Sequence, residues 1–166
     1  TIIIFMFCAA TNFSLHYYFI AKGKFEYYKD QEFRVYFGLC IIVSILFFIN
    51  IVSSNKYQIN LLTLRHSIFT AVSILTTTGF STENFNDWPE MSKTLLFFLF
   101  FIGGSAGSTT GGMKIIRSIL VFRYLVYEVR KLLHPKGVFN ITIGGRTIED
   151  DVVQATLGFY LFYLLI

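Results

Sequence analysis

Two short stretches of this sequence combine glycines with hydroxyl-bearing side chains, and each lies between strongly apolar segments. The first is TTTGFST at 76–82, and the second is GGSAGSTTGG at 103–112. Neither contains histidine, aspartate or glutamate, so neither supplies its own general base or a carboxylate-rich metal site. Both supply backbone carbonyl and hydroxyl oxygens, which can bind a hard cation that passes through chemically unchanged.

The 76–82 heptad has the residues expected of a cation-binding stretch of backbone. Carbonyl oxygens can replace the hydration shell of an ion, Gly79 permits conformations that other residues avoid, and threonine hydroxyls add further oxygen ligands. The absence of a carboxylate disfavours a divalent ion. We expect Phe80 to anchor the segment against neighbouring helices. The heptad alone leaves a competing interpretation open, namely a polar turn that ends a helix in an extracellular loop.

The composition indicates that the elements around these stretches lie in a membrane. Of the 166 residues, 54% are hydrophobic and 14% are charged, whereas soluble domains carry about 25% charged residues. Asn12, Ser14 and His16 interrupt the first apolar run, where we expect them to hydrogen-bond other helices. The expected membrane spans are 1–20, 35–52, 94–133 with a break at 103–112, and the start of a further span at 152–166.

The positions of the charged residues predict the topology. The segments 21–34 and 113–150 hold eleven of the fourteen Lys and Arg residues, and cytoplasmic loops are enriched in these residues. Both segments are therefore expected in the cytoplasm, and the 53–93 region outside. Residues 61–75 are apolar but give a helix of only about 22 Å, too short for the ~30 Å hydrocarbon core. We expect this segment to enter the membrane as a short helix and to return as the 76–82 heptad.

A re-entrant arrangement gives the heptad a function that a surface turn lacks. Backbone at membrane depth costs several kcal/mol per unsatisfied group unless protein or water covers it. Lining an aqueous pore meets that requirement. The carbonyl end of the 61–75 helix carries a partial negative charge, which favours a cation at its tip. The surroundings therefore favour a cation filter at 76–82 over a surface turn.

The second stretch is expected near the middle of the membrane. Nine helical residues from Thr94 to Ile102 cover about 14 Å, roughly half the bilayer. The loop at 103–112 is flexible, polar and without large side chains, so we expect a movable constriction below the filter. The alternative is a patch of small residues for close helix packing. A phosphate-binding loop is excluded, because Met113 stands where its lysine would be and no strand precedes it.

Together, TTTGFST after a short helix and GGSAGSTTGGMKIIR within the next span resemble the Trk/Ktr/HKT potassium transporters. The resemblance covers essentially the whole chain, and the glycine-rich run is highly specific. It implies an all-α membrane protein with repeats of transmembrane helix, re-entrant pore helix plus filter, and a broken second transmembrane helix, as in potassium channels. The chain would then be an internal piece of a longer protein. Its parts would be the end of the second repeat at 1–20, a cytoplasmic loop at 21–34, the third repeat at 35–133, a cytoplasmic loop or hairpin at 134–151, and the next helix from 152 to 166.

The resemblance also implies roles for particular residues. Ordinary potassium channels have Gly-Tyr-Gly where this chain has Gly79-Phe80-Ser81, a departure that bears on the discrimination of potassium from sodium. One quarter of a selectivity filter, offering backbone carbonyls to potassium, would consist of Thr77, Thr78, Gly79 and Phe80. The gating loop would consist of Gly103, Gly104, Ser105, Ala106, Gly107, Ser108, Thr109, Thr110, Gly111 and Gly112.

Partners and location follow from the same resemblance. It implies a protein of the bacterial inner membrane that forms a homodimer and binds a cytosolic nucleotide-binding regulatory ring of TrkA type. The bound cofactor expected in this chain is the potassium ion, with no organic cofactor and no nucleic acid. Lys114 and Arg117, close behind the loop, and a hairpin around Gly144-Gly145 are the expected regulatory contacts. The alternative for these cations is ordinary positive-inside charge.

Two other classes of function are alternatives to a transporter. An intramembrane hydrolase would use a serine or threonine of the 103–112 loop, yet the loop lacks the base that activates such a nucleophile. His16, His66 and His134 lie on three separate segments, so no metal site is expected. A non-conducting structural subunit would need no re-entrant segment. We therefore expect a transporter without catalytic residues.

Overall fold

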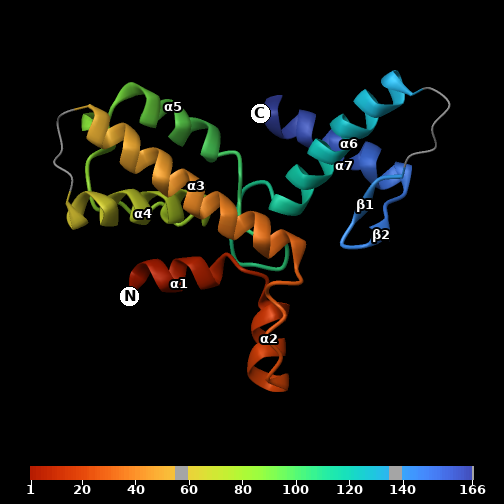
Figure 1. Cartoon of the computed structure of the whole chain (residues 1–166), viewed down its shortest axis with the longest axis horizontal. Coiled ribbons are helices and arrows are strands. Elements are labelled where there is room, and N and C mark those ends of the chain that lie inside the picture. Colours follow the sequence, from red (N-terminus) through yellow and green to blue (C-terminus); the bar gives the residue numbers. More distant parts are fainter. Residues whose placement is uncertain (55–59, 135–139, 166) are drawn as a thin grey trace. The chain divides into compact units, whose positions relative to one another are not determined.

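The computed structural model describes residues 1–54, 60–134 and 140–165, apart from the side chain of Arg146. It is predominantly helical, with a two-stranded hairpin (Figure 1). The chain divides into two units, Thr1–Ile115 and Ile116–Ile166, and each is described by itself. The elements are α1 (Ile2–Ala9), α2 (Phe13–Lys22), α3 (Gln31–Ser53), α4 (Leu61–Leu75), a 3-10 turn (Phe85–Asp87), α5 (Glu90–Leu99), α6 (Ile115–Leu133), β1 (Thr142–Ile143), β2 (Arg146–Thr147) and α7 (Asp150–Leu165).

The long helix α3 organises the first unit and lies against α4 and α5 (Figure 1). Its start is fixed by Asp30, whose side chain accepts a hydrogen bond from the Phe33 N–H at 2.6 Å. Its buried face carries Tyr36, Cys40, Val43, Phe47 and Ile51, and its exposed face carries Phe37, Ile41, Ile42, Ile45, Leu46 and Ile49. Within the described residues, α3 is the helix that is long and apolar enough to cross a membrane by itself. An exposed apolar face of this size suits lipid or a protein partner.

The short helix α4 has the bounds expected from the sequence and lies against α1, α3 and α5. Ten of its fifteen residues are buried, several of them polar. The Asn60 side chain caps its first turn by accepting hydrogen bonds from the N–H and the hydroxyl of Thr63, at 2.9 and 3.1 Å. The enclosure of so short a helix is what the re-entrant interpretation requires, while its function as a pore helix stays a prediction.

The expected single helix over 1–20 is wrong. α1 and α2 meet at an angle of 103°, and the chain between them is not helical. The Asn12 side chain accepts a hydrogen bond from the Ser14 N–H at 2.8 Å and so starts a new helix. The break leaves the carbonyls of Ala9 and Ala10 without the helical partners that a continuous span would supply.

Other expected boundaries shift because helices start at capping residues rather than at the first apolar residue. Asp30 starts α3 at Gln31, ahead of the expected residue 35. Pro89, whose fixed φ suits a helix start, precedes α5 at Glu90, ahead of the expected Thr94. The connection expected at 21–34 is 23–30 in the structure, and the one expected at 103–112 is 100–114. The last helix, α7, begins at Asp150 rather than at residue 152. Residues 135–139 of the expected 134–151 loop lie outside the described residues.

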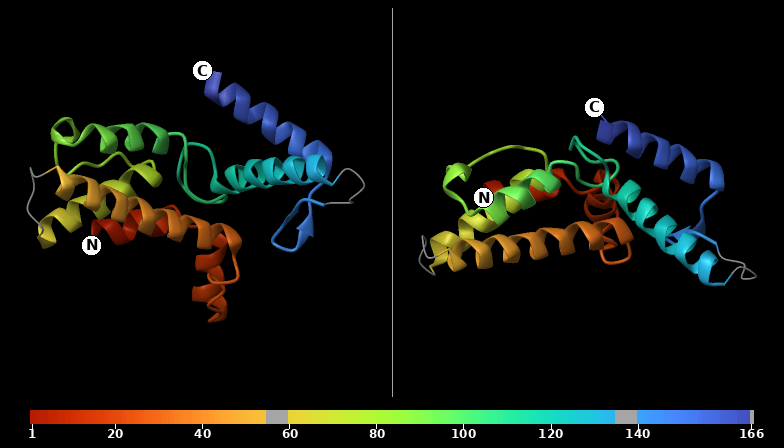
Figure 2. Two further views of the ribbon diagram at one scale, coloured as in Figure 1. Left: turned by 45° about the horizontal axis from the view of Figure 1, so that its top comes forward. Right: turned by 90° about the horizontal axis from the view of Figure 1, so that it is seen from above.

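In the second unit, the hairpin of β1 and β2 lies in the connection between α6 and α7 (Figure 2). A small apolar cluster joins these elements through the buried side chains of Leu120, Ile141 and Val153. β1 and β2 pair antiparallel around Gly144 and Gly145, whose φ angles are 57° and 79°. Positive φ at both turn residues suits a tight hairpin, so the hairpin expected at this position is present.

The Asn60 cap of α4 is expected to contribute about 1 kcal/mol to stability. Asn60→Ala removes the acceptor of two hydrogen bonds and should lower the melting temperature of the full-length protein in detergent. Asn60→Asp keeps an acceptor oxygen and is the matched control. Equal melting temperatures for the alanine variant and the parent would contradict this expectation.

Candidate functional site

The 76–82 heptad folds back onto the last turn of α4. Thr78 and Gly79 both direct their N–H groups at the Ser73 carbonyl, at 3.0 and 3.4 Å. The Ser73 hydroxyl in turn donates to the Phe80 carbonyl at 2.6 Å. Ser73 is fully buried in α4. Its main-chain carbonyl and its hydroxyl therefore fix the two ends of the 78–80 stretch.

The backbone of the heptad is held in an uncommon conformation. Thr77 has a φ of 53° and Gly79 a φ of 71°, and a β-branched residue rarely adopts a positive φ. Thr77 is the non-glycine residue that does so in the described part of the chain. Among the described residues, the carbonyls of Thr77, Thr78 and Gly79 accept no hydrogen bond. Three successive carbonyls without a protein donor are available to an ion.

Within the described residues, Phe80 does not anchor the heptad as expected. Its side chain is 56% exposed, whereas the Thr78 hydroxyl lies 3.2 Å from the Met6 sulfur of α1 and 2.6 Å from the Thr76 hydroxyl. Hydrogen bonds from hydroxyl and backbone groups, rather than an aromatic side chain, therefore hold this segment.

The glycine-rich loop is seated on the break between α1 and α2. The Ser105 N–H donates to the Ala10 carbonyl at 2.9 Å. Both the N–H and the hydroxyl of Thr109 donate to the Ala9 carbonyl, at 3.2 and 3.1 Å. In the opposite direction, the Phe13 N–H donates to the Gly107 carbonyl at 3.1 Å. The loop thus supplies the partners that the broken helix lacks, although the two segments lie about ninety residues apart in the chain.

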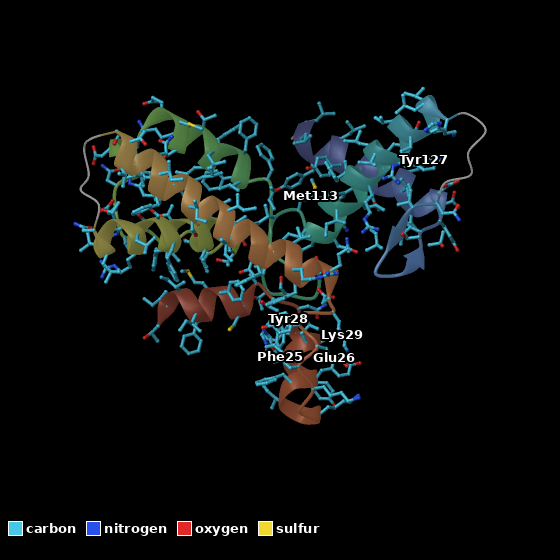
Figure 3. The ribbon with its side chains drawn as sticks, viewed as in Figure 1. Phe25, Glu26, Tyr28, Lys29, Met113 and Tyr127 are labelled. Atoms are coloured by element: carbon cyan, nitrogen blue, oxygen red, sulfur yellow. The ribbon has the colours of Figure 1, made fainter. Side chains whose placement is uncertain are left out.

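The two ends of the loop are joined by backbone hydrogen bonds. The Gly103 N–H donates to the carbonyl of Met113, labelled in Figure 3, at 2.7 Å, and the Ile115 N–H donates to the Gly104 carbonyl at 3.2 Å. There is no space for side chains at these glycines. A Cβ on Gly103 would lie 2.1 Å from the Gly111 carbonyl oxygen. Close backbone approach explains glycine here better than flexibility alone.

A buried carboxylate also holds the loop. The Ala106 N–H donates to Oε1 of Glu32 at 2.8 Å, and Glu32 is only 6% exposed. Glu32 is absent from the site residues predicted from the sequence, because it lies in the charged 21–34 segment, which is expected to be a cytoplasmic loop. Its signal was present in the Asp30-Gln31-Glu32 run, which is typical of the first turn of a helix.

The heptad and the loop are in direct contact. The Gly111 N–H donates to the Thr77 hydroxyl at 2.8 Å, so the strained residue of one segment binds the backbone of the other. A Cβ on Gly112 would approach the Thr77 methyl group within 3.5 Å. The structure therefore joins the two stretches that the sequence singled out separately.

The two cations proposed for regulation make contacts within the chain. Lys114 Nζ donates to the carbonyl and the hydroxyl of Thr110, the latter at 3.0 Å. In the second unit, the Arg117 guanidinium lies 4.1 Å from the centre of the Phe159 ring. A regulatory contact for either residue stays a prediction. Across the described ranges, no group of three or more His, Cys, Asp or Glu residues is placed to hold a metal.

Comparison with known proteins gives a consistent family. The family model described as "TrkH: Cation transport protein" matches residues 1–166. The "Trk system potassium uptake protein TrkH" of Vibrio parahaemolyticus is 37% identical over 167 residues, covering 99% of this chain and 34% of that protein. The protein of the same name from Escherichia coli strain K12 is 34% identical over 166 residues, with coverage of 99% and 34%. The chain spans about a third of the length of these relatives.

A solved structure supports the fold. The "Crystal Structure of the Potassium Transporter TrkH from Vibrio parahaemolyticus" superimposes with a TM-score of 0.92 at 37% identity, covering 98% of this chain and 36% of that chain. The expected fold class, an all-α membrane protein, is therefore confirmed.

The tight approach at Gly103 predicts a marked difference between two glycines. Gly103→Ala should lower the unfolding free energy by about 1–3 kcal/mol, the usual cost of overpacking, because its Cβ would meet the Gly111 carbonyl at 2.1 Å. Gly38→Ala on α3 is the matched control, since nothing lies within 4 Å of its Cβ, and alanine is the better helix former. Thermal unfolding in detergent measures both, and equal effects would refute the packing argument.

Proposed function

This chain belongs to the TrkH family of cation transport proteins, and on that premise we propose that it contributes one quarter of a potassium-selective pore for uptake across the cell membrane. The observation that carries the proposal is the heptad after α4. Its Thr77, Thr78 and Gly79 carbonyls have no donor among the described residues, and they follow a short helix that is largely buried.

The proposed filter binds a dehydrated potassium ion through backbone oxygens. Carbonyl groups replace the lost hydration shell, and the carbonyl end of α4 adds a partial negative charge at the same point. Ser73 prevents the stretch from relaxing by holding Thr78, Gly79 and Phe80. Because the Phe80 carbonyl already accepts the Ser73 hydroxyl, its share in ion binding is smaller than that of the three carbonyls before it.

The glycine-rich loop acts as the gate in this proposal. It has polar backbone and no large side chain, and it touches the filter directly through Gly111 and Thr77. Glu32 and the α1–α2 break hold it in the position seen here. Opening would exchange these hydrogen bonds for hydrogen bonds to water in a hydrated pore, which limits the cost of movement.

The rest of the pore and the partners belong to the whole protein. Three further filter segments, homodimer formation, location in the bacterial inner membrane and binding of a TrkA-type nucleotide-binding ring are proposals that rest on the family. In this chain, Lys114, Arg117 and the hairpin of β1 and β2 are the proposed regulatory contacts.

The hydrolase alternative gains no support from the loop. The buried Ser105 hydroxyl has no hydrogen-bond partner among the described residues. The Ser108 hydroxyl contacts the Ser105 carbonyl and the Thr110 hydroxyl, at 2.8 Å for the latter. Neither arrangement includes the base that a nucleophilic serine needs.

Gly79→Ala tests the filter in the full-length protein reconstituted into liposomes. Alanine at a φ of 71° is strained by roughly 1–2 kcal/mol, which corresponds to about a tenfold change in the population of the filter geometry. Potassium and rubidium flux, or their ratio to sodium flux, should fall by a similar factor. Gly23→Ala carries the same backbone strain at a φ of 62°, with open space around its Cβ, yet lies outside the filter. Unchanged flux and selectivity in Gly79→Ala would reject the filter assignment.

Glu32→Gln tests the gate. The amide can still accept the Ala106 N–H, but a neutral acceptor is weaker than a carboxylate by about 1 kcal/mol. Basal potassium flux should therefore rise severalfold while the ratio of potassium to sodium flux stays constant. Glu26→Gln removes a charge from the neighbouring 23–30 connection (Figure 3) and should leave flux unchanged. A rise in flux in both variants would indicate a general charge effect rather than release of the loop.

A further inference from the structure

One histidine of α4 contacts two successive residues just beyond the heptad. Nδ1 of His66 lies 2.8 Å from the Thr82 hydroxyl, and Nε2 lies 3.3 Å from a carboxylate oxygen of Glu83. His66 is 7% exposed, so its ring is held within the protein. These contacts join residues sixteen and seventeen positions apart.

The spacing of these contacts matches the geometry of the heptad. His66 and Ser73 are seven residues apart, which puts them on one face of α4 about 10 Å apart along its axis. Glu83 and Phe80, their respective partners, are three residues apart, and three residues of chain reach at most about 10 Å. The segment from 80 to 83 is therefore fixed to α4 at both ends: Ser73 holds Phe80, and His66 holds Glu83.

The histidine contact works in both protonation states. With a single proton on Nε2, His66 donates to Glu83 and accepts the hydroxyl hydrogen of Thr82. When both nitrogens carry protons, the Thr82 hydroxyl turns and accepts instead. The link is thus maintained by hydrogen bonding and does not require a charged histidine.

Glu83 is held from two further directions. The Trp88 Nε1–H lies 3.4 Å from its second carboxylate oxygen, and the Ser81 hydroxyl donates to its main-chain carbonyl. Trp88 is itself buried and packs edge-on against Phe47 of α3, with ring centres 5.4 Å apart. The carboxylate therefore connects the end of the heptad to two buried elements.

We propose that the His66–Glu83 pair is a specificity-determining clamp, which holds the outer end of the filter at the spacing that favours potassium over sodium. This inference rests on the proposed function, since the residues it positions are Thr77 to Phe80. Among the described residues, loss of His66 leaves the Ser73–Phe80 hydrogen bond as the tie between α4 and the segment that follows Gly79, and loss of Glu83 leaves in addition the single His66–Thr82 hydrogen bond. The filter then relaxes, and its carbonyls can close around a smaller ion.

The experiment measures the ratio of potassium to sodium flux for the full-length protein in liposomes. His66→Ala and Glu83→Ala should each lower the ratio by about tenfold, within the range of coupling between contacting residues. The double variant should have a flux ratio no lower than that of either single variant, because both substitutions remove the same His66–Glu83 contact. Glu83→Gln keeps an oxygen that accepts the His66 N–H, so it should stay within about twofold of the parent. A flux ratio does not depend on the amount of folded protein, which separates selectivity from loss of expression.

Glu90→Ala is the matched control. Glu90 forms an exposed ion pair with Lys93 at 2.9 Å, so its removal changes the same charge without touching the clamp, and the ratio should not move. If the flux ratio of Glu83→Gln falls as far as that of Glu83→Ala, the charge of Glu83 and not the clamp sets selectivity, and the proposal is overturned. The proposal is also overturned if both alanine variants keep the flux ratio of the parent protein. Absence of potassium flux in the parent protein would instead refute the proposed function.

Discussion

The need to satisfy backbone groups away from water governs this structure more than any single side chain. A helix satisfies its own N–H and carbonyl groups, so each interruption inside a membrane protein needs a partner. In the described part of the first unit, the break after α1 and the 100–114 connection are such interruptions. They satisfy each other through the hydrogen bonds of Ser105, Thr109 and Phe13. The heptad solves the same problem differently: Thr78 and Gly79 donate their N–H groups to the Ser73 carbonyl, and three carbonyls are left without a donor among the described residues.

Polar side chains inside this apolar chain therefore have specific structural tasks. Asn12 begins a helix, Glu32 receives a loop N–H, and Ser73 holds both sides of a turn. Each is placed where a regular element ends. Replacing Glu32 or Ser73 by an apolar residue of similar size would leave a part-buried backbone group without its partner, which costs more than the loss of the side chain's own contacts.

Local patterns predicted the elements whose signals are local. The α4 helix, the non-helical 76–82 heptad and the Gly144-Gly145 hairpin follow from apolar run length, polar interruption and turn residues, and the family resemblance was confirmed over the whole chain. The α1–α2 break was missed, because the run up to residue 20 is apolar enough for one span and the loop that compensates the break lies about ninety residues later. The contacts of Glu32 and His66 were missed for the same reason, although the helix start at Asp30 has a local signal. Their partners are backbone or side-chain groups that only the folded chain brings near.

The hydrogen bond between Gly111 and Thr77 has a thermodynamic consequence. It ties the proposed gate to a residue of the proposed filter, so the two cannot shift independently without losing this contact. Coupling between two binding equilibria is reciprocal. If displacement of the loop changes the affinity of the heptad for a cation by some factor, binding of the cation changes the loop equilibrium by the same factor. Ion concentration would then act as an effector of gating, even without a nucleotide signal from any partner.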